Sequence, residues 1–237
     1  AFDATAGTWS APALIGATPE AVFAVASDLE RYPEWQDFLQ RVSVRERDAD
    51  GRPTLVETEE RVALRAAVTE LASRFGPKYL HEKAVKHEPP LELWAEAGKA
   101  GFLGVNIPTE YGGGGAGIYE LSLVLEELGA NGCPLLMLVV SPAICGTIIS
   151  RFGTDAQKQR WLPGIADGST IMAFGITEPD AGSNSHRITT TAKRDGAEWV
   201  LSGQKVFISG IDSAEAVLIV SRTEDEKTGK LKPALFI

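Results

Sequence analysis

The stretch Phe174-Gly-Ile-Thr-Glu-Pro-Asp-Ala-Gly-Ser183 marks the point at which the pattern of apolar residues changes along this chain. Before it, from about residue 57 to residue 170, apolar residues recur at steps of three and four, which is typical of amphipathic helices. After it, short alternating segments between turn residues predict strands. We therefore expect an α+β fold, with a helical bundle over 57–170 and a partial antiparallel β domain over 171–237.

The helical part has two clear apolar stripes and one long apolar run. One helix is predicted to have Glu57, Glu59 and Glu60 in its first turn, and a second stripe runs from Ile118 to Leu128 and is stopped by Gly129. Thr154 with Gln157 has the spacing of a capping box. The run over 135–152 is nearly long enough to cross a membrane, but Pro, Gly and hydroxyl residues interrupt it. We expect a buried helix that is kinked near its proline.

The β part is predicted to contain a hairpin and three further strands besides Ile171–Ile176. Asp195-Gly196 is the turn signal of the hairpin. Its two strands are Ile188–Arg194 and Glu198–Leu201, and the further strands are Lys205–Ser209, Ala216–Ser221 and Ala234–Ile237.

Charge and composition exclude some functions. The chain of 237 residues carries a net charge of −9, which repels phosphate backbones and argues against nucleic-acid binding. The two cysteines, Cys133 and Cys145, lie in apolar surroundings and are expected to be buried free thiols. The three histidines have no metal-ligand spacing, so no metal site is predicted. We expect a cytoplasmic protein.

The loop that ends at Ser183 has the composition of a ligand-binding turn. Thr177 and Ser183 supply hydroxyl groups on either side of it, and Gly182 allows the backbone to approach a ligand closely. An ordinary surface turn has the same composition, and spacing alone leaves the two interpretations about equal. Glu178 and Asp180 are expected to set the turn.

A second stretch, Gly203-Gln-Lys-Val-Phe-Ile-Ser209, places an aromatic residue and a hydroxyl two positions apart. On the predicted strand, Phe207 and Ser209 would point to one face, where a ring and a hydroxyl can flank a planar heterocycle. The alternative is that Phe207 belongs to the core, which the residue type alone favours.

Both stretches resemble signatures of the acyl-CoA dehydrogenase family, the Thr-Glu-Pro-x-Ala-Gly-Ser loop and Gly-Gln-Lys-x-Trp-Ile-Thr. The stretch that starts Ala100-Gly-Phe-Leu-Gly and the stretch Arg151-Phe-Gly-Thr-Asp-Ala-Gln-Lys158 also resemble that family, and the motifs follow in family order over about 180 residues. Phe207 stands where Trp is usual and Ser209 where Thr is usual, and each keeps the chemical type.

The resemblance implies FAD as cofactor and an acyl-CoA thioester as substrate, oxidised between its α and β carbons. It assigns the cofactor to Phe174, Ile176, Thr177, Ser183, Phe207, Ile208 and Ser209, and the substrate to Gly182 and Ser183. It implies a glutamate base in a C-terminal helical domain beyond Ile237, and therefore no catalytic residue in this chain. Electron-transfer flavoprotein is the implied electron acceptor, and family members form homo- or hetero-oligomers.

Two alternatives of other classes remain. One is a non-catalytic partner subunit that binds flavin or acyl-CoA, and the other is a lipid-binding module. The second rests on residues 1–56, where the stretch Ser27-Asp-Leu-Glu-Arg-Tyr-Pro-Glu-Trp35 resembles the start of a polyketide-cyclase or START-like lipid-binding domain. So few residues are not expected to close the cavity of that fold. The expected domains are thus 1–56, 57–170 and 171–237.

Overall fold

The computed structural model describes residues 2–3, 8–9, 42–47, 49, 53–225 and 227–237, and the chain divides into two compact units, 1–63 and 64–237. In the first unit, β1 (Phe2–Asp3) pairs with β2 (Thr8–Trp9), and β3 (Val42–Arg47) pairs antiparallel with β4 (Pro53–Thr58). The prediction that residues 1–56 close no lipid cavity lies largely outside the described residues and stays a prediction.

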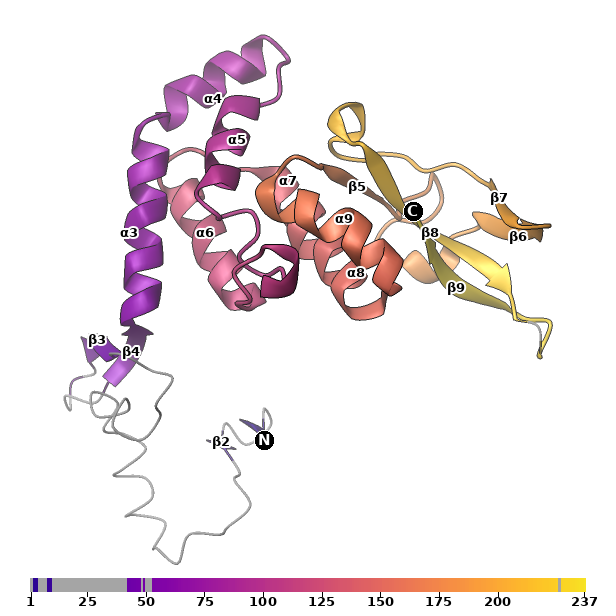
Figure 1. Ribbon diagram of the computed structural model, residues 1–237, viewed down its shortest axis with the longest axis horizontal. Coiled ribbons are helices and arrows are strands. Elements are labelled where there is room, and N and C mark those ends of the chain that lie inside the picture. Colours follow the sequence, from indigo (N-terminus) through magenta and orange to yellow (C-terminus); the bar gives the residue numbers. More distant parts are fainter. Residues whose placement is uncertain (1, 4–7, 10–41, 48, 50–52, 226) are drawn as a thin grey trace, which may run out of the picture. The chain divides into compact units, whose positions relative to one another are not determined.

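The predicted helical region is confirmed, and its helices follow one another with short connections (Figure 1). The Thr154–Gln157 capping box is present at the start of the last helix. Two apolar stripes form much of the core, with Val68 and Leu71 from one helix facing Leu121 and Leu128 from another. The helices are α3 (Glu59–Ser73), α4 (Gly76–Val85), α5 (Leu91–Lys99), η2 (Thr109–Tyr111), α6 (Ile118–Ala130), α7 (Leu136–Leu138), η3 (Val139–Gly146), α8 (Thr147–Phe152) and α9 (Asp155–Asp167).

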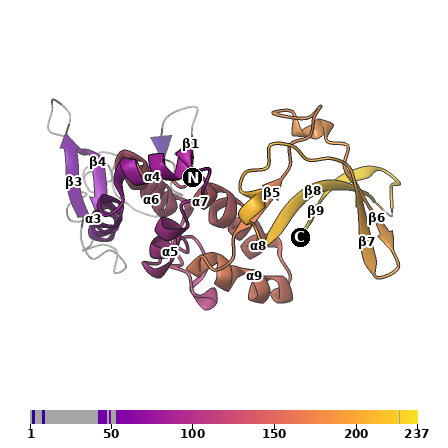
Figure 2. The same ribbon diagram turned by 90° about the horizontal axis from the view of Figure 1, so that it is seen from above.

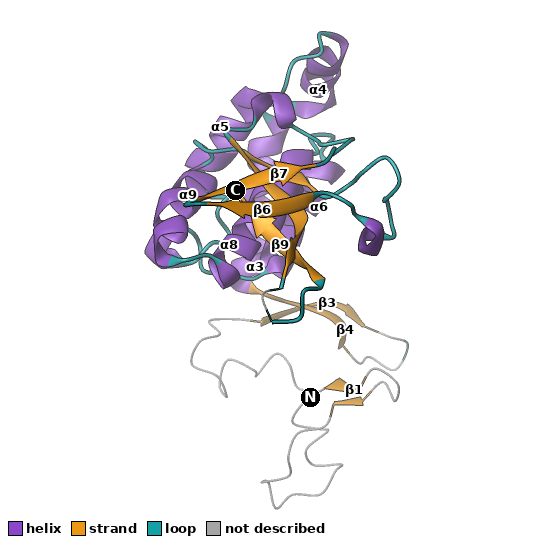
Figure 3. Cartoon of the chain, turned by 90° about the vertical axis from the view of Figure 1, so that its right-hand side faces the viewer, coloured by secondary structure: helices purple, strands orange, loops and turns teal. Residues whose placement is uncertain are grey.

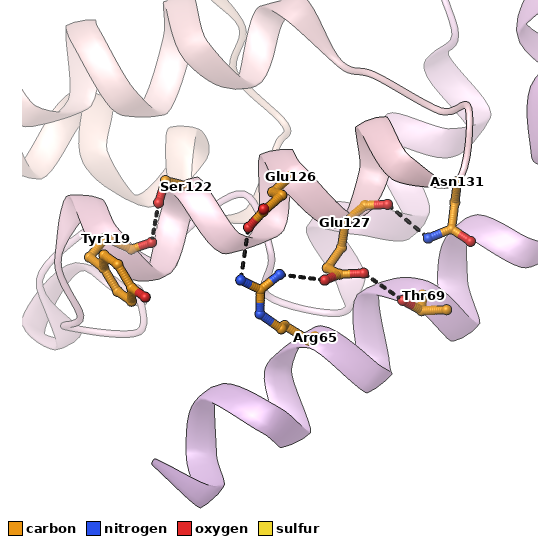
Figure 4. Close-up of polar contacts among 7 residues, drawn as sticks. All are labelled: Arg65, Thr69, Tyr119, Ser122, Glu126, Glu127 and Asn131. Carbon is orange, nitrogen blue, oxygen red and sulfur yellow. Dashed lines mark hydrogen bonds and ion pairs between the residues drawn. The ribbon is translucent and has the colours of Figure 1, made fainter. Parts of the chain in front are cut away.

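A network of hydrogen bonds and ion pairs connects α3 to α6 beside this core. The Arg65 guanidinium bonds Glu126 and Glu127, and the Thr69 hydroxyl donates to the other oxygen of Glu127 at 3.0 Å (Figure 4). Because one carboxylate receives donors from two successive turns of α3, the contact sets the register between the two helices as well as their proximity.

The apolar run over 135–152 forms one interrupted helix, as predicted, but it is only partly buried, since Leu136 and Phe152 are exposed. Its middle, η3, is a π-helix that contains Pro142, which has no N–H to donate to the preceding turn. The Asn106 side chain donates to the Pro142 carbonyl at 2.9 Å and to the Thr147 hydroxyl at 3.1 Å, so it supports the irregular turn. Both cysteines are buried and free, as predicted, and burial raises the pKa of the Cys145 thiol to about 12.

The β region forms one five-stranded sheet, with helices α3–α9 gathered on one side of it (Figures 1 and 2). The strands are β5 (Met172–Gly175), β6 (Thr191–Asp195), β7 (Glu198–Ser202), β8 (Ala216–Glu224) and β9 (Leu231–Phe236), with single 3₁₀ turns η4 (Ser185–Arg187) and η5 (Ile211–Ser213) between them. The hairpin β6–β7 extends away from the helices, and Figure 3 shows these strands crossing in front of them.

The α+β class is confirmed, but the sheet is mixed and not wholly antiparallel. Strand β8 pairs parallel with β5 and β6 and antiparallel with β9. The long connections that contain η4 and η5 allow parallel pairing, which a tight hairpin does not. No helix in the described part of the chain is long and apolar enough to cross a membrane.

Candidate functional site

The predicted ligand loop leaves β5 and folds into a tight turn. Glu178 N–H donates to the Ala181 carbonyl at 3.0 Å, and Ala181 N–H donates back to the Glu178 carbonyl at 3.1 Å. Pro179 and Asp180 occupy the exposed tip between them. Gly182 and Ser183 follow the turn and are exposed, so the loop presents its far end to solvent.

The Glu178 carboxylate is buried under this turn and accepts four hydrogen bonds. Thr189 donates from its N–H at 2.6 Å and its hydroxyl at 2.8 Å, Thr190 from its N–H at 2.9 Å, and Lys205 from its ammonium at 2.8 Å. Burial opposes ionisation of Glu178, but the bonds from Lys205 and the two threonines outweigh it and hold its pKa well below the usual range. Glu178 therefore anchors the turn as a carboxylate, as expected of it.

Lys205 joins this loop to the second predicted stretch. Its ammonium also donates to the Ile176 carbonyl at 3.0 Å, and Val206 N–H donates to the Thr177 carbonyl at 3.0 Å. Gly203 lies against Thr190, since a Cβ at Gly203 would be 2.3 Å from the threonine hydroxyl oxygen. Loop 176–183 and segment 203–209 are thus held side by side, and we call the two together the joined loops.

The predicted strand over Lys205–Ser209 is wrong. Residues 203–210 form no strand, and Phe207 has a left-handed backbone with φ of +57°. The bonds from Lys205 and Val206 fix the start of the segment to loop 176–183, and the chain then turns away at Phe207. The two-residue alternation that would have placed Phe207 and Ser209 on one face does not apply here.

Phe207 is 91% exposed, so the core alternative for this ring is excluded. A large aromatic side chain in a left-handed conformation lacks both burial and favourable backbone geometry. Backbone strain of this kind is concentrated at functional sites, ligand-binding sites among them.

Strand β5 lies at the edge of the described sheet, so one of its two sides pairs with no other strand. Ile171 accepts a bond from Glu215 N–H, whereas Met172 N–H donates to the Ser141 hydroxyl at 3.1 Å. Residues of a strand direct their N–H and C=O groups to alternate edges, so Phe174 presents its backbone on the edge away from β8, as Met172 does. The Phe174 side chain packs into the core around Ile165 and Leu218.

The remaining predicted residues divide by exposure. Ser209 is exposed, like Gly182 and Ser183, and Ile176, Thr177 and Ile208 are half-buried. The structure brings the two stretches together through their backbones and Lys205. That the side chains of Thr177, Ser183, Phe207 and Ser209 converge on one cleft stays a prediction.

The sequence alone assigned no role to Lys205, Thr189 or Gly203. These residues hold the two loops in place and are not among the residues predicted to contact a ligand. The sequence held one indication of a role for Lys205. A cation follows the predicted hairpin in a mainly apolar segment, and the acidic residue Glu178 follows β5, so the two could have been expected to pair. Pairing across 27 positions is not visible from periodicity, however.

Comparisons with known proteins agree with the order of these elements. Residues 58–169 match the acyl-CoA dehydrogenase N-terminal domain and 173–237 its middle domain, whereas 15–81 match polyketide cyclase / dehydrase and lipid transport proteins. Acyl-CoA dehydrogenase FadE12 of Mycobacterium tuberculosis is 68% identical over 184 residues, 78% of this chain and 47% of that protein.

Two solved structures are similar in fold. A glutaryl-coenzyme A dehydrogenase in its glutaryl-CoA complex gives a TM-score of 0.70 at 27% identity, covering 76% of this chain and 47% of that one. A glutaryl-CoA dehydrogenase of Mycobacterium smegmatis in complex with FADH2 gives 0.67 at 29%, covering 75% and 45%. The chain spans about half the length of the relatives it matches.

Proposed function

Because this chain belongs to the acyl-CoA dehydrogenase family, we propose that it takes part in the FAD-dependent oxidation of acyl-CoA thioesters to α,β-unsaturated products. The observation that carries the proposal is the pair of joined loops, one of which bears the exposed Phe207 ring. A surface turn without a ligand would give no reason for a strained, solvent-facing ring at this point.

The residues present fit a flavin. Phe207 offers a ring face, Phe174 offers backbone groups on the edge of β5 away from β8, and the hydroxyls of Thr177 and Ser209 come from the two loops that Lys205 joins. We assign Ile176 and Ile208 to the apolar margin of the same site. FAD, when bound, would accept the hydride from the β carbon of the acyl group.

Gly182 and Ser183 fit the thioester and CoA. A Cβ at Gly182 would meet no atom within 4 Å, so a ligand has room to approach the backbone there. The neighbouring Ser183 hydroxyl can donate to it. Backbone N–H groups of such turns bind anionic oxygens even in an acidic protein, which is consistent with a CoA ligand despite the net charge of −9.

We assign no general base among these site residues. Glu178 is buried and its carboxylate is occupied by four donors, and Asp180 lies at the exposed tip of the turn. A base must lie within hydrogen-bond reach of the proton it takes. We therefore propose that the base lies outside these residues. We also propose that electron-transfer flavoprotein accepts the electrons.

FAD titration of the chain, followed by flavin absorbance and fluorescence, tests the cofactor assignment. We expect saturable binding that Phe207→Ala weakens and Phe152→Ala does not, since Phe152 is also an exposed aromatic (77%) but lies on α8. Absence of FAD binding to the chain, or equal affinities of both variants and the wild type, would contradict the assignment.

Anaerobic mixing with acyl-CoAs tests the reaction. The FAD-loaded chain is expected to bind the thioester without rapid bleaching of the flavin. Fusing the chain to the part of FadE12 that it does not match is expected to restore bleaching, because that part would supply the base. Rapid bleaching by the chain alone would show that residues 1–237 contain a base, and Asp180→Asn would be the first variant to examine.

A further inference from the structure

Helix α4 differs from the helices next to it in the chain because it has no buried residue. Helices α3 and α5, before and after it, each bury several residues in the core. In α4 only Gly76, Tyr79, Leu80 and Lys83 are half-buried, and the rest is exposed. Helices in proteins are stabilised mainly by packing of an apolar face, and elements with little such packing open locally at low cost. We therefore expect α4 to open more readily than its neighbours.

The first turn of α4 is anchored. A Cβ at Gly132 would be 2.8 Å from the Cβ of Pro77, so the start of the helix lies directly against the turn after α6. The Tyr79 ring packs edge-on against Phe75, with the ring centroids 4.9 Å apart. Gly76 has a φ of +70°, and a Cβ on it would meet no atom within 4 Å. The chain therefore enters α4 through a left-handed glycine in open space, next to a fixed turn that can act as a pivot.

The other end of α4 is held to α5 by polar contacts. The Lys83 ammonium bonds Glu92 at 2.7 Å and Glu88 at 3.3 Å, and the Tyr79 hydroxyl donates to Glu92 at 2.7 Å. Hydrogen bonds from Lys83 and Tyr79 lower the pKa of Glu92 to about 2, so this carboxylate is ionised at neutral pH. The Glu92 side chain is 59% exposed, and water and salt compete for a pair of this kind. We call Tyr79, Lys83 and Glu92 the latch.

The C-terminal end of α4 is also strained. His87 has a left-handed backbone with a φ of +54°. Its N–H donates to the Ala84 carbonyl at 3.1 Å, and Glu88 N–H donates to the Lys83 carbonyl at 2.9 Å. This hydrogen-bond pattern ends many helices, and glycine is usual at its left-handed position because a Cβ is unfavourable there. The latch therefore holds an end of the helix that is weaker than the anchored first turn.

The side of α4 that faces the protein borders a cavity of about 380 Å³ with mainly apolar walls. Leu80 and Ala84 line it from α4, and Trp94, which is 5% exposed, lines it from α5. Since this part of α4 borders empty space, moving it away breaks fewer van der Waals contacts than moving a close-packed helix would.

We propose that α4 is a hinged flap, which pivots on its anchored first turn and opens the apolar cavity when the latch at Glu92 is released. A molecule can then enter the cavity while the core between α3 and α6 stays folded. The flap is independent of the function proposed for the joined loops, and its test needs no flavin or CoA ester.

Hydrogen exchange of the chain, followed by mass spectrometry, tests the flap. We expect the amides of α4 to exchange faster than those of α3 and α6. Glu92→Gln should speed exchange in α4 by roughly two- to five-fold, the effect of losing an exposed ion pair, and leave α6 unchanged. Glu96→Gln is the matched control, because Glu96 lies on the same helix α5 and pairs with Lys99 at 2.7 Å. Exchange in α4 as slow as in α6, or equal effects of the two variants, would overturn the proposal.

Salt separates release of the latch from general loosening of the helix. Raising the ionic strength from about 0.01 M to about 1 M shortens the range of charge interactions from about 30 Å to about 3 Å. Exchange in α4 should therefore become faster with salt in the wild type and in Glu96→Gln but not in Glu92→Gln. The same salt response in all three proteins would show that the latch does not hold α4.

Access to the cavity needs its own measurement. Acrylamide quenching of Trp94, obtained as the difference between the chain and its Trp94→Phe variant, should increase in Glu92→Gln. If Trp94→Phe does not fold, maleimide labelling of Leu80→Cys measures exposure of the opposite wall, and it should be faster when Glu92→Gln is added. Faster exchange in α4 without greater exposure of either wall would mean that the helix frays over a closed cavity, which overturns the flap.

Discussion

Glu178 and Lys205 form a buried ion pair, with the ammonium nitrogen 2.8 Å from the carboxylate, that holds two loops of the candidate site together. Their side chains are 4% and 11% exposed. Because Lys205 also bonds the Ile176 carbonyl, one side chain connects the end of β5, the turn after it and the segment that leads to Phe207. The residues of both loops that we propose to contact a ligand depend on this pair for their relative position.

Removing one partner of the pair should destabilise the fold strongly. Glu178→Gln or Lys205→Met leaves a buried charge uncompensated, which typically costs about 3–5 kcal/mol. Urea unfolding measures it, and the double variant should lose less than the sum of the two single losses. Lys78→Met, in the exposed pair with Glu82, is the control and should have no measurable effect. Strictly additive losses would show that the two side chains are not coupled.

The same pair should make the free energy of unfolding depend on pH in the acidic range. The pKa of Glu178 is lower in the folded state than its ordinary value of 4.5, so its stabilising contribution is present above that pH and is lost as the pH falls toward the folded value. The free energy of unfolding should therefore drop below pH 4.5 more steeply in the wild type than in Glu178→Gln. Parallel pH profiles of the two proteins would contradict this.

Phe207→Gly should separate ligand binding from folding. Glycine adopts the left-handed conformation without strain, which should stabilise the folded state by roughly 1–2 kcal/mol. Its greater conformational freedom in the unfolded chain should destabilise the folded state by about 0.5–1 kcal/mol. We therefore expect no loss of thermal stability but a clear loss of FAD affinity. His87→Gly is the control, because His87 has a similar φ of +54° and is remote in sequence from the joined loops; its FAD affinity should be unchanged. A large drop in melting temperature in Phe207→Gly would show that the ring supports the fold.

Two glycines of the site should respond differently to alanine. Gly203→Ala places a Cβ against Thr190 and should cost about 1–3 kcal/mol, because neither loop can move away without breaking the bonds to Glu178. Gly182→Ala enters open space and should leave unfolding unchanged while it weakens acyl-CoA binding. Calorimetry of unfolding and of ligand binding separates the two effects, and unchanged acyl-CoA affinity in Gly182→Ala would remove this residue from the substrate site.

Periodicity and turn chemistry were enough to predict a helical region and most strands, but they did not place α4 or α5 individually. The stripe that contains Val68 and Leu71 is buried as predicted, and Asp195-Gly196 closes the predicted hairpin. Ile118 is an exception within its stripe, since it is the first residue of α6 and is exposed. The site motifs were found by resemblance, because spacing alone left a surface turn equally plausible for loop 176–183.

The arrangement of residues 203–210 lay beyond what local patterns could establish. Alternation favoured a strand over Lys205–Ser209, yet hydrogen bonds to Ile176, Thr177 and Glu178 decide its path. Local signals act over a few residues and therefore determined which segments became helix, strand or turn. Contacts between segments 11 or more positions apart decided the orientation of Phe207, the ionisation of Glu178 and the parallel pairing of β5 with β8. The reason is that a buried charge or an unpaired strand edge reaches its lowest free energy only when the distant partner is in place.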